Sequence, residues 1–167
     1  MYGLVLEGGG AKGAYQVGAW KAIRELGIEI KGISGTSVGA LNGAIMVQDD
    51  FEYGYDLWYN INPSKVMSIE DKLMRKLVKL DITPDNIQYI VHQLKNVLGG
   101  KGLDITPLKN LLKDTIKEDL IRKSGKDFGI VTVSLTDRKP LELFIEDIPE
   151  GQLVNYLLAS ANLPVFK

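Results

Sequence analysis

Residues 32–43 read GISGTSVGALNG, and this stretch determines the fold that the sequence predicts. A short apolar run, Ile30 to Ser34, enters it, and a longer apolar segment, Val38 to Gln48, leaves it. A short run bounded by glycine is typical of a buried strand, whereas a segment that is apolar on nearly every side is typical of a helix packed against a sheet. The sequence therefore predicts a sharp turn between a strand and a helix.

The centre of this turn is Ser37, which has Gly35 and Gly39 two residues to either side. The pattern G-x-S-x-G between a strand and a helix is typical of a nucleophile elbow, in which a strained serine with positive φ presents its hydroxyl. Glycine at both flanking positions relieves the collisions that side chains would cause there. We predict that Ser37 is a catalytic nucleophile and that Thr36 and Val38 complete the elbow; a flexible turn without chemistry is the alternative.

A second glycine-rich turn precedes the elbow in the chain. Tyr2 to Leu6 is predicted as a buried strand and Ala14 to Leu26 as a helix, with the turn between them. Backbone N–H groups of consecutive glycines at a helix N-terminus suit the oxyanion that forms when an ester carbonyl is attacked. A turn used only for close packing is the alternative. The predicted oxyanion hole comprises Gly8, Gly9, Gly10, Ala11, Lys12 and Gly13.

The same turn also fits the dinucleotide-binding pattern G-x-G-x-x-G, but its surroundings favour that function less. A dinucleotide site needs an acidic residue roughly 20 residues further on, where this chain has the polar run Ser34 to Ser37. A phosphate-binding P-loop needs Gly-Lys followed by Ser or Thr, whereas here Lys12 precedes Gly13. A non-catalytic nucleotide-binding α/β module is therefore kept only as an alternative function.

The composition of the chain restricts its partners. The 167 residues carry 20 Lys and Arg against 21 Asp and Glu, a net charge of −1 that gives no basic footprint for nucleic acid. Cysteine is absent, which excludes disulfides, thiolate metal sites and cysteine nucleophiles. The N-terminal sequence lacks the leader of a signal peptide, and no apolar run reaches the ~20 residues of a spanning helix. We expect a cytoplasmic protein without metal or cofactor, and the sequence predicts no oligomeric state.

The rest of the chain completes an α/β pattern. Residues 87–98 are predicted as an amphipathic helix, and the sequence DITP, with Thr as the N-cap, marks helix starts at 81–84 and 104–107. Phe128 to Leu135 and Leu141 to Ile145 are predicted as a hairpin, and Gln152 to Ala161 as a helix. This order predicts one domain over residues 1–167, an α/β fold of three layers (α/β/α) around a mostly parallel sheet.

A serine nucleophile needs a base, and the single histidine of the chain, His92, is a poor candidate. On the helix predicted at 87–98 it lies opposite the apolar face, in water. The remaining option is a carboxylate that accepts the serine proton directly. Such a Ser–Asp dyad depends on hydrogen-bond geometry and on strong oxyanion stabilisation, because an Asp of ordinary pKa is a weak base.

Three of the four sequence blocks of the patatin-like phospholipases resemble stretches of this chain: LEGGGAKGAYQVG at 6–18, GTSVGALNG at 35–43 and LLASANLPVF at 157–166. The resemblance implies that the glycine block forms the oxyanion hole, that Ser37 is the nucleophile and that the base is the Asp of a D-G-[GA] block. It implies a serine hydrolase of lipid or other acyl esters. A thioesterase or an acyltransferase with the same nucleophile is the alternative.

The D-G-[GA] block itself does not occur in this sequence, where it would follow Phe166. Asp137 is the nearest substitute, but it lies in the predicted hairpin turn, where Asp has structural reasons to occur. We therefore expect a patatin-like domain that is incomplete at its C-terminus and lacks the catalytic Asp. On this prediction the chain has little esterase activity, while a longer parent hydrolyses short acyl esters.

Aromatic residues gather just after the predicted elbow helix. One interpretation is an acyl-chain groove or a rim that contacts a membrane peripherally, since Tyr and Trp favour boundaries between apolar and aqueous surroundings. The other interpretation is ordinary packing in the core. The residues predicted for the groove are Phe51, Tyr55, Trp58 and Tyr59.

Overall fold

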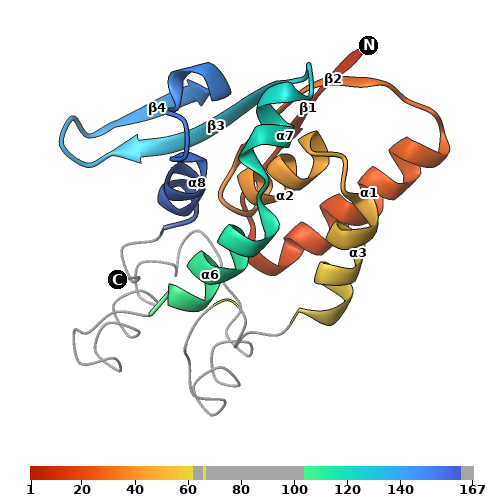
Figure 1. Ribbon diagram of the computed structural model, residues 1–167, viewed down its shortest axis with the longest axis horizontal. Helices are drawn as coiled ribbons and strands as arrows, with labels where there is room; N and C mark the ends of the chain where they lie inside the picture. Colours follow the sequence, from red (N-terminus) through yellow and green to blue (C-terminus); the bar gives the residue numbers. More distant parts are fainter. Residues whose placement is uncertain (62–65, 67–103, 163–167) are drawn as a thin grey trace, which may run out of the picture. The chain divides into compact units, whose positions relative to one another are not determined.

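The computed structural model describes residues 1–61, 66 and 104–162 (Figure 1). The helix predicted at 87–98 and His92 lie outside these residues. The chain divides into two compact units, of which the first comprises Met1–Asn60 and Lys113–Asn162. The second comprises Ile61–Leu112 and Leu163–Lys167. The predicted elbow and the predicted oxyanion loop both belong to the first unit.

The first unit contains a four-stranded sheet in the order β1-β2-β3-β4. Its strands are β1 (Tyr2–Leu6), β2 (Ile30–Thr36), β3 (Asp127–Ser134) and β4 (Lys139–Phe144). The first three are parallel to one another, and β4 returns antiparallel to β3 as the predicted hairpin. The α/β class, the mostly parallel sheet and the hairpin are therefore confirmed.

Helices connect these strands in the order that the sequence predicts. The helix predicted at 14–26 begins one residue earlier, at Gly13, and the helix predicted at 152–161 begins one residue later, at Leu153. Such shifts are common at helix ends. The helical elements are η1 (Gly10–Lys12), α1 (Gly13–Glu25), α2 (Val38–Val47), α3 (Phe51–Asn60), α6 (Thr106–Thr115), α7 (Glu118–Lys123), η3 (Ile145–Asp147) and α8 (Leu153–Ala161).

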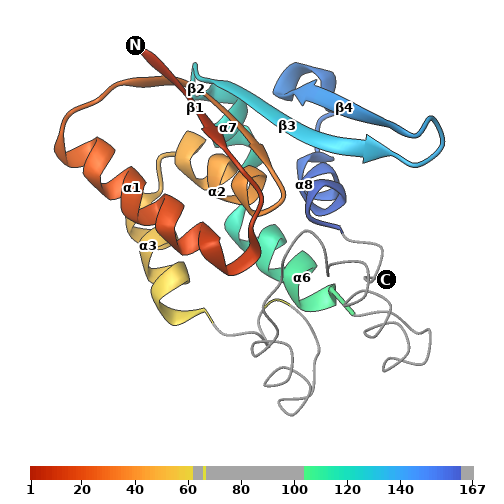
Figure 2. The same cartoon turned by 180° about the vertical axis from the view of Figure 1, so that it is seen from behind.

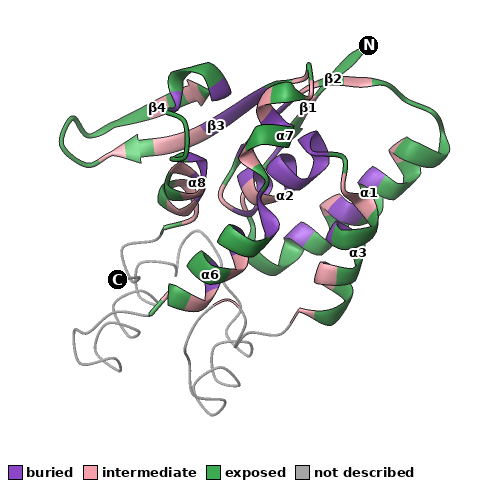
Figure 3. Cartoon of the chain, viewed as in Figure 1, coloured by how far each residue is buried: buried purple, intermediate pink, exposed green. Residues whose placement is uncertain are grey.

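The core lies between the sheet and α2, the helix that follows the elbow. Nine of the ten residues of α2 are buried, and Figure 3 shows the helix coloured as buried along its length. A Cβ atom at Gly43 would lie 3.2 Å from the side chains of Ile33 and Phe128, so the helix crosses directly over β2 and β3. This position explains why α2 is apolar on nearly every side. It also fixes the start of the helix, and with it Ser37, against the sheet.

The helices that pack directly on the strands, α2 and α8, contact each other and cover the same face of the sheet (Figure 1 and, from behind, Figure 2). The opposite face carries one row of residues in register, Val5, Ser34, Gly129 and Phe144. Val5 is 81% exposed and Phe144 is 55% exposed. The described residues therefore account for two of the three predicted layers, the sheet and the helices on one face.

In the second unit, the helix start predicted at DITP (104–107) is confirmed, but the predicted cap is not. α6 begins at Thr106, and the N–H of Thr106 donates to the carboxylate of Asp104 at 2.8 Å. The capping side chain is thus that of Asp104, because the helix starts one residue earlier than the Thr cap requires. Asp and Thr both serve as N-terminal caps, so the sequence pattern alone favoured neither.

Candidate active site

Ser37 lies at the junction of β2 and α2 with a strained backbone. Its φ is 54° and its ψ is −128°, a conformation that residues other than glycine rarely adopt. The N–H groups of Ala40 and Leu41 donate to the carbonyl oxygen of Ser37 at 2.9 and 3.2 Å. The side chain of Ser37 does not cap the helix, as a serine at this position usually does. The positive φ predicted for this residue is confirmed, and its hydroxyl is not used by the helix.

The two flanking glycines are required by close contacts of the backbone. A Cβ atom at Gly35 would overlap the carbonyl group of Gly39. A Cβ atom at Gly39 would overlap the carbonyl oxygen of Leu6 and would lie 2.7 Å from that of Glu7. Backbone atoms cannot move aside as a flexible side chain can. The steric reason predicted for G-x-S-x-G is therefore confirmed. The contacts of Gly39 also show that the elbow packs tightly against the end of β1.

The glycine loop reaches the side chain of Ser37. Leu6 at the end of β1 is in register with Gly35, so the turns that follow the two parallel strands leave the sheet side by side. A Cβ atom at Gly8 would lie 3.2 Å from Ser37 Cβ and 3.9 Å from Ser37 Oγ. The backbone of Gly8 thus lies directly on the serine side chain. The structure brings together the two turns that the sequence predicts as one site.

The loop leaves part of its backbone free to bind an anion. The N–H of Lys12 donates to the carbonyl oxygen of Gly9 at 3.1 Å, and the N–H of Gly13 bonds within the same turn. Among the described residues, the N–H groups of Gly8, Gly9, Gly10 and Ala11 donate to no backbone carbonyl. Lys12 and Gly13 are therefore removed from the predicted oxyanion donors, because their N–H groups already donate to carbonyl oxygens of the loop.

One further donor follows Ser37 directly. The N–H of Val38, at the first position of α2, has no backbone acceptor in the part of the chain that the structure describes. It lies at the positive end of the helix dipole. Val38 was predicted only as part of the elbow, although its place after the serine is where oxyanion donors of this kind of turn occur.

Lys12 folds back along the glycine loop. A Cβ atom at Gly9 would lie 3.3 Å from Lys12 Cβ and 3.5 Å from Lys12 Cδ, so the stem of the lysine covers Gly9. The residue is exposed at the N-terminal end of α1, and its charge adds to the positive end of that helix. This arrangement suits the supporting role in anion binding that the sequence predicts for Lys12.

Asn42 connects the elbow helix to the glycine loop. It is 2% exposed, and its amide nitrogen donates to the carbonyl oxygen of Gly13 at 3.0 Å and to Gln16 Oε1 at 2.8 Å. Gln16 Nε2 in turn donates to the carbonyl oxygen of Glu7 at 2.8 Å. The two ends of the loop, Glu7 and Gly13, are thus tied to α2. A polar residue inside an otherwise apolar helix was the signal in the sequence that could have identified Asn42.

Of the four aromatic residues predicted for an acyl groove, Phe51, Tyr55 and Tyr59 form a row of ring contacts on α3, with 5.9 Å between the ring centroids of Phe51 and Tyr55. Phe51 packs edge-to-face on Trp20, with ring centroids 5.0 Å apart, which matches the alternative of core packing. Trp58 donates its indole N–H to Asn42 Oδ1 at 2.8 Å, and its ring and the side chain of Val38 both lie against Gly13. Tyr55 and Tyr59 stack on each other and are 40% and 80% exposed. Trp58 alone lies beside the predicted site.

Glu118 holds the start of α8. Its carboxylate accepts hydrogen bonds from Arg122 at 2.7 Å and from the backbone N–H groups of Gly151 and Leu153 at 2.9 and 3.1 Å. Burial acts to raise the pKa of Glu118, but the hydrogen bonds from Arg122, Leu153 and Gly151 outweigh it and hold that pKa below its ordinary value. A charged Glu118 therefore stabilises α8 at neutral pH.

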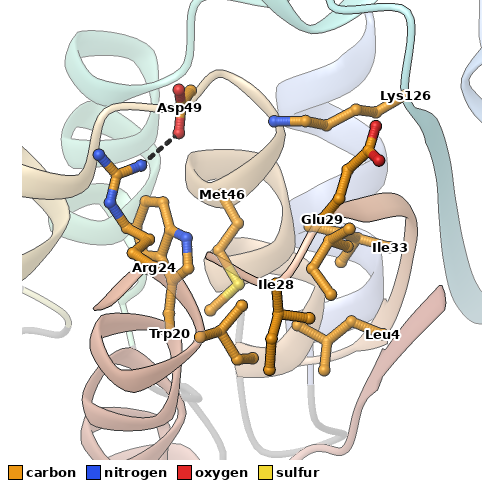
Figure 4. A pocket seen from close by; sticks show the side chains of 11 residues that line it. Leu4, Trp20, Arg24, Ile28, Glu29, Ile33, Met46, Asp49 and Lys126 are labelled. Carbon is orange, nitrogen blue, oxygen red and sulfur yellow. Dashed lines mark hydrogen bonds and ion pairs between the residues drawn. The ribbon is translucent and has the colours of Figure 1, made fainter. Parts of the chain in front are cut away.

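A separate cavity of about 210 Å³ lies at the other end of the sheet (Figure 4). Its apolar floor includes Trp20, Ile28 and Met46, and its rim carries the ion pair between Arg24 and Asp49, with 2.6 Å between Arg24 Nη1 and Asp49 Oδ1. The lining residues Glu29 and Ile30 stand at the start of β2, whereas Ser37 follows its end. This cavity is distinct from the predicted site.

The structure gives Asp137 a structural role. Its carboxylate accepts a hydrogen bond from Ser134 Oγ at 2.9 Å, and its N–H donates to the same hydroxyl at 3.1 Å, within the turn between β3 and β4. No carboxylate of the described residues is hydrogen-bonded to Ser37 Oγ. The described residues also contain no group of three potential metal ligands and no helix long and apolar enough to cross a bilayer.

Known proteins of one family resemble this chain. The profile of the family described as patatin-like phospholipase matches residues 4–166. Patatin-like phospholipase domain-containing protein 7 of Rattus norvegicus is 35% identical over 119 residues, which is 70% of this chain and 8% of that protein. Lysophospholipase nte1 of Aspergillus terreus is 60% identical over 47 residues, 28% of this chain and 3% of the relative. The chain spans less than a tenth of the length of these curated relatives.

Two solved structures share the fold. VipD from Legionella pneumophila superposes with a TM-score of 0.60 at 17% identity, covering 98% of this chain and 42% of that one. The type III effector protein ExoU superposes with a TM-score of 0.51 at 20% identity, covering 97% of this chain and 40% of that one. At these identities the likeness concerns the fold.

Proposed function

The chain belongs to the patatin-like phospholipase family, and on this premise we propose that Ser37 is the nucleophile of a lipid acyl hydrolase. The observation that carries the proposal is the position of Gly8 against the side chain of Ser37. That contact sets a strained serine beside a loop whose N–H groups at Gly9, Gly10 and Ala11 are free among the described residues. A nucleophile next to fixed backbone donors is the arrangement that acyl transfer requires.

The reaction proceeds in two steps. In the first, Ser37 Oγ attacks the ester carbonyl carbon and its proton passes to a base, while the former carbonyl oxygen takes the negative charge. The oxyanion then collapses, the alcohol leaves with a proton and an acyl-serine remains. In the second, water attacks the acyl-serine, the acid departs and Ser37 regains its proton. The N–H groups of the loop and of Val38 stabilise the oxyanion in both steps.

The base in this proposal is a carboxylate that no described residue supplies. It follows from the resemblance to the family, in which an Asp accepts the serine proton directly. A weak base of this kind makes oxyanion stabilisation the larger contribution, since losing a single donor typically costs ~10²–10³ in rate. The loop donors, with Lys12 in support, therefore carry much of the proposed catalysis.

The proposed substrate is a phospholipid or lysophospholipid, to which the names of the relatives point. The exposed Tyr55 and Tyr59 of α3 lie on the same helix as Trp58, which borders the elbow. Aromatic side chains of this kind favour the boundary of a lipid surface. We accordingly place the enzyme in the cytoplasm with peripheral membrane contact through α3, and we propose hydrolysis rather than thioester cleavage or acyl transfer.

The test is labelling with a fluorophosphonate, which phosphonylates an activated serine and releases fluoride. In the full-length protein the probe is expected to modify Ser37, and Ser37→Ala is expected to abolish both labelling and hydrolysis of a short-chain ester. Ser34→Ala is the matched control, because this serine lies three residues earlier on β2 in the row at the face opposite α2. Labelling that persists in Ser37→Ala, or thermal stabilisation by NAD without labelling, would contradict the proposal.

A further inference from the structure

The helix α8 reaches the elbow through one hydroxyl group, that of Ser160. The N–H of Ser37 donates to Ser160 Oγ at 2.9 Å, and Ser160 Oγ lies 2.6 Å from the carbonyl oxygen of Val131. A carbonyl oxygen cannot donate, so the single hydroxyl proton points at Val131 and a lone pair accepts from Ser37. The direction of both hydrogen bonds is therefore fixed by chemistry.

This hydroxyl stands where the ladder between β2 and β3 ends. Thr36, the last residue of β2, is in register with Val131. The hydroxyl of Ser160 bridges the N–H of the next residue, Ser37, and the carbonyl group of Val131. It thereby attaches the peptide between Thr36 and Ser37 to the neighbouring strand, at the point where the chain turns out of the sheet.

This hydrogen bond holds Ser37, whose strained backbone needs support from its surroundings. A residue other than glycine keeps a positive φ only where its surroundings over-determine it. The carbonyl group of Ser37 is held by Ala40 and Leu41, and its N–H is held by Ser160. With both backbone groups fixed, the Cα–Cβ bond of Ser37 points in one direction, towards Gly8 of the loop.

We propose that Ser160 is a positioning residue for the nucleophile. It fixes the amide of Ser37 and, through it, the orientation of Ser37 Oγ towards the oxyanion loop. It also occupies the Ser37 N–H, so that oxyanion stabilisation falls to Val38 and the loop. The inference rests on the proposed role of Ser37 as nucleophile.

A matched control exists in the same unit. The hydroxyl of Ser124 likewise bridges two backbone groups, donating to the carbonyl oxygen of Ile121 at 2.8 Å and accepting from the N–H of Lys126 at 3.1 Å. It lies at the end of α7. Ser124→Ala removes the same kind of bridge without touching the elbow, and Ser160→Thr keeps the hydroxyl at the elbow.

The kinetic test measures kcat and KM for a 4-nitrophenyl ester in the full-length protein. Ser160→Ala is expected to lower kcat about 10- to 100-fold with KM within about twofold, because a displaced nucleophile slows the chemical step more than binding. Ser160→Thr is expected to recover most of kcat, and Ser124→Ala to stay within about twofold of the wild type. Equal kcat values for Ser160→Ala and Ser124→Ala would overturn the inference.

A second measurement does not depend on activity. Amide hydrogen exchange, followed by NMR, is expected to be about tenfold faster or more at Ser37 in Ser160→Ala and unchanged there in Ser124→Ala. An exchange rate at Ser37 that is the same in Ser160→Ala as in the wild type would overturn the inference. Exchange that depends on Ser160 in a protein whose Ser37 resists the fluorophosphonate would overturn the proposed function alone.

Discussion

The two glycine-rich turns follow neighbouring parallel strands, yet they use glycine for different reasons. In the elbow, Gly35 and Gly39 are required by backbone atoms that leave no room for a Cβ atom. In the loop, Gly8 makes room for the side chain of Ser37, whereas Gly10 has open space around it and a φ of 55°. The elbow is therefore a packed turn, whereas the loop is open at Gly10.

This difference separates the two tasks of an acyl hydrolase. The packed elbow holds one side chain in one direction, which suits a nucleophile. The open loop presents N–H groups, which suits the stabilisation of an oxyanion. The contact of Gly8 with Ser37 and the hydrogen bonds of Asn42 join the two turns. Substitutions in the two turns should consequently differ in kind as well as in size.

The largest effect on stability is expected for Gly39→Ala, which would break the packed turn. The new methyl group overlaps the carbonyl oxygen of Leu6, so strand or helix must shift, at a cost of about 3 kcal/mol or more in the free energy of unfolding. Gly18→Ala is the control, because Gly18 lies in α1 with no atom near its Cβ position. That change should stabilise by about 0.5–1 kcal/mol. Urea unfolding of both variants measures the difference in their free energies of unfolding, and equal free energies would contradict the packing described.

The next largest effect is expected for Asn42→Ala, which removes the connection between the turns. The carbonyl group of Gly13 and the indole N–H of Trp58 each lose a hydrogen-bond partner, and about 2–4 kcal/mol of stability is lost. Ester hydrolysis should fall further than unfolding explains, because the loop is no longer tied to the elbow helix. Asn155→Ala on the exposed face of α8 is the control. Unchanged turnover by folded Asn42→Ala protein would show that the connection is dispensable.

A smaller effect concerns α8, which is attached to the elbow through Ser160. The lowered pKa of Glu118 means that its charge stabilises the fold above the ordinary glutamate pKa and that this contribution is lost as the pH falls through the lower, folded value. Stability should thus decline below about pH 4.3, and Glu118→Gln should cost about 1–2 kcal/mol at pH 7 and remove that decline. The test is the free energy of unfolding as a function of pH for the wild type, Glu118→Gln and the exposed control Glu150→Gln. An identical acid profile for all three proteins would refute the role of Glu118.

The smallest effect on stability is expected for Gly10→Ala in the open loop. The positive φ costs about 1 kcal/mol with a side chain present, while the space around the residue accepts a methyl group. The N–H is kept, so kcat should fall less than about tenfold. Urea unfolding and ester turnover of Gly10→Ala, measured on the same protein, test the two expected effects. A loss as large as that of Gly39→Ala would mean that the loop is packed as tightly as the elbow.

Much of the fold could be predicted from the sequence because its signals are local. The bounds of β1 were predicted to the residue, and the start of α2 followed from the glycines around Ser37. The polar contacts of the site could not be predicted, because they join distant segments. Ser160 and Ser37 are 123 positions apart, and Asn42 and Trp58 are 16 apart. In the sequence, Asn42 and Ser160 stood out as polar residues within apolar helices, and both lie in stretches that resemble the family blocks, but neither signal named their partners.

The most direct measurement of the central claim is a crystal structure of the full-length protein after reaction with a fluorophosphonate. The adduct places a phosphonyl oxygen where the oxyanion would form. We predict that phosphorus is bonded to Ser37 Oγ and that this oxygen lies about 3 Å from N–H groups of Gly9, Gly10 or Val38. An adduct on another residue, or a phosphonyl oxygen on Ser37 that faces solvent away from the glycine loop, would contradict the account.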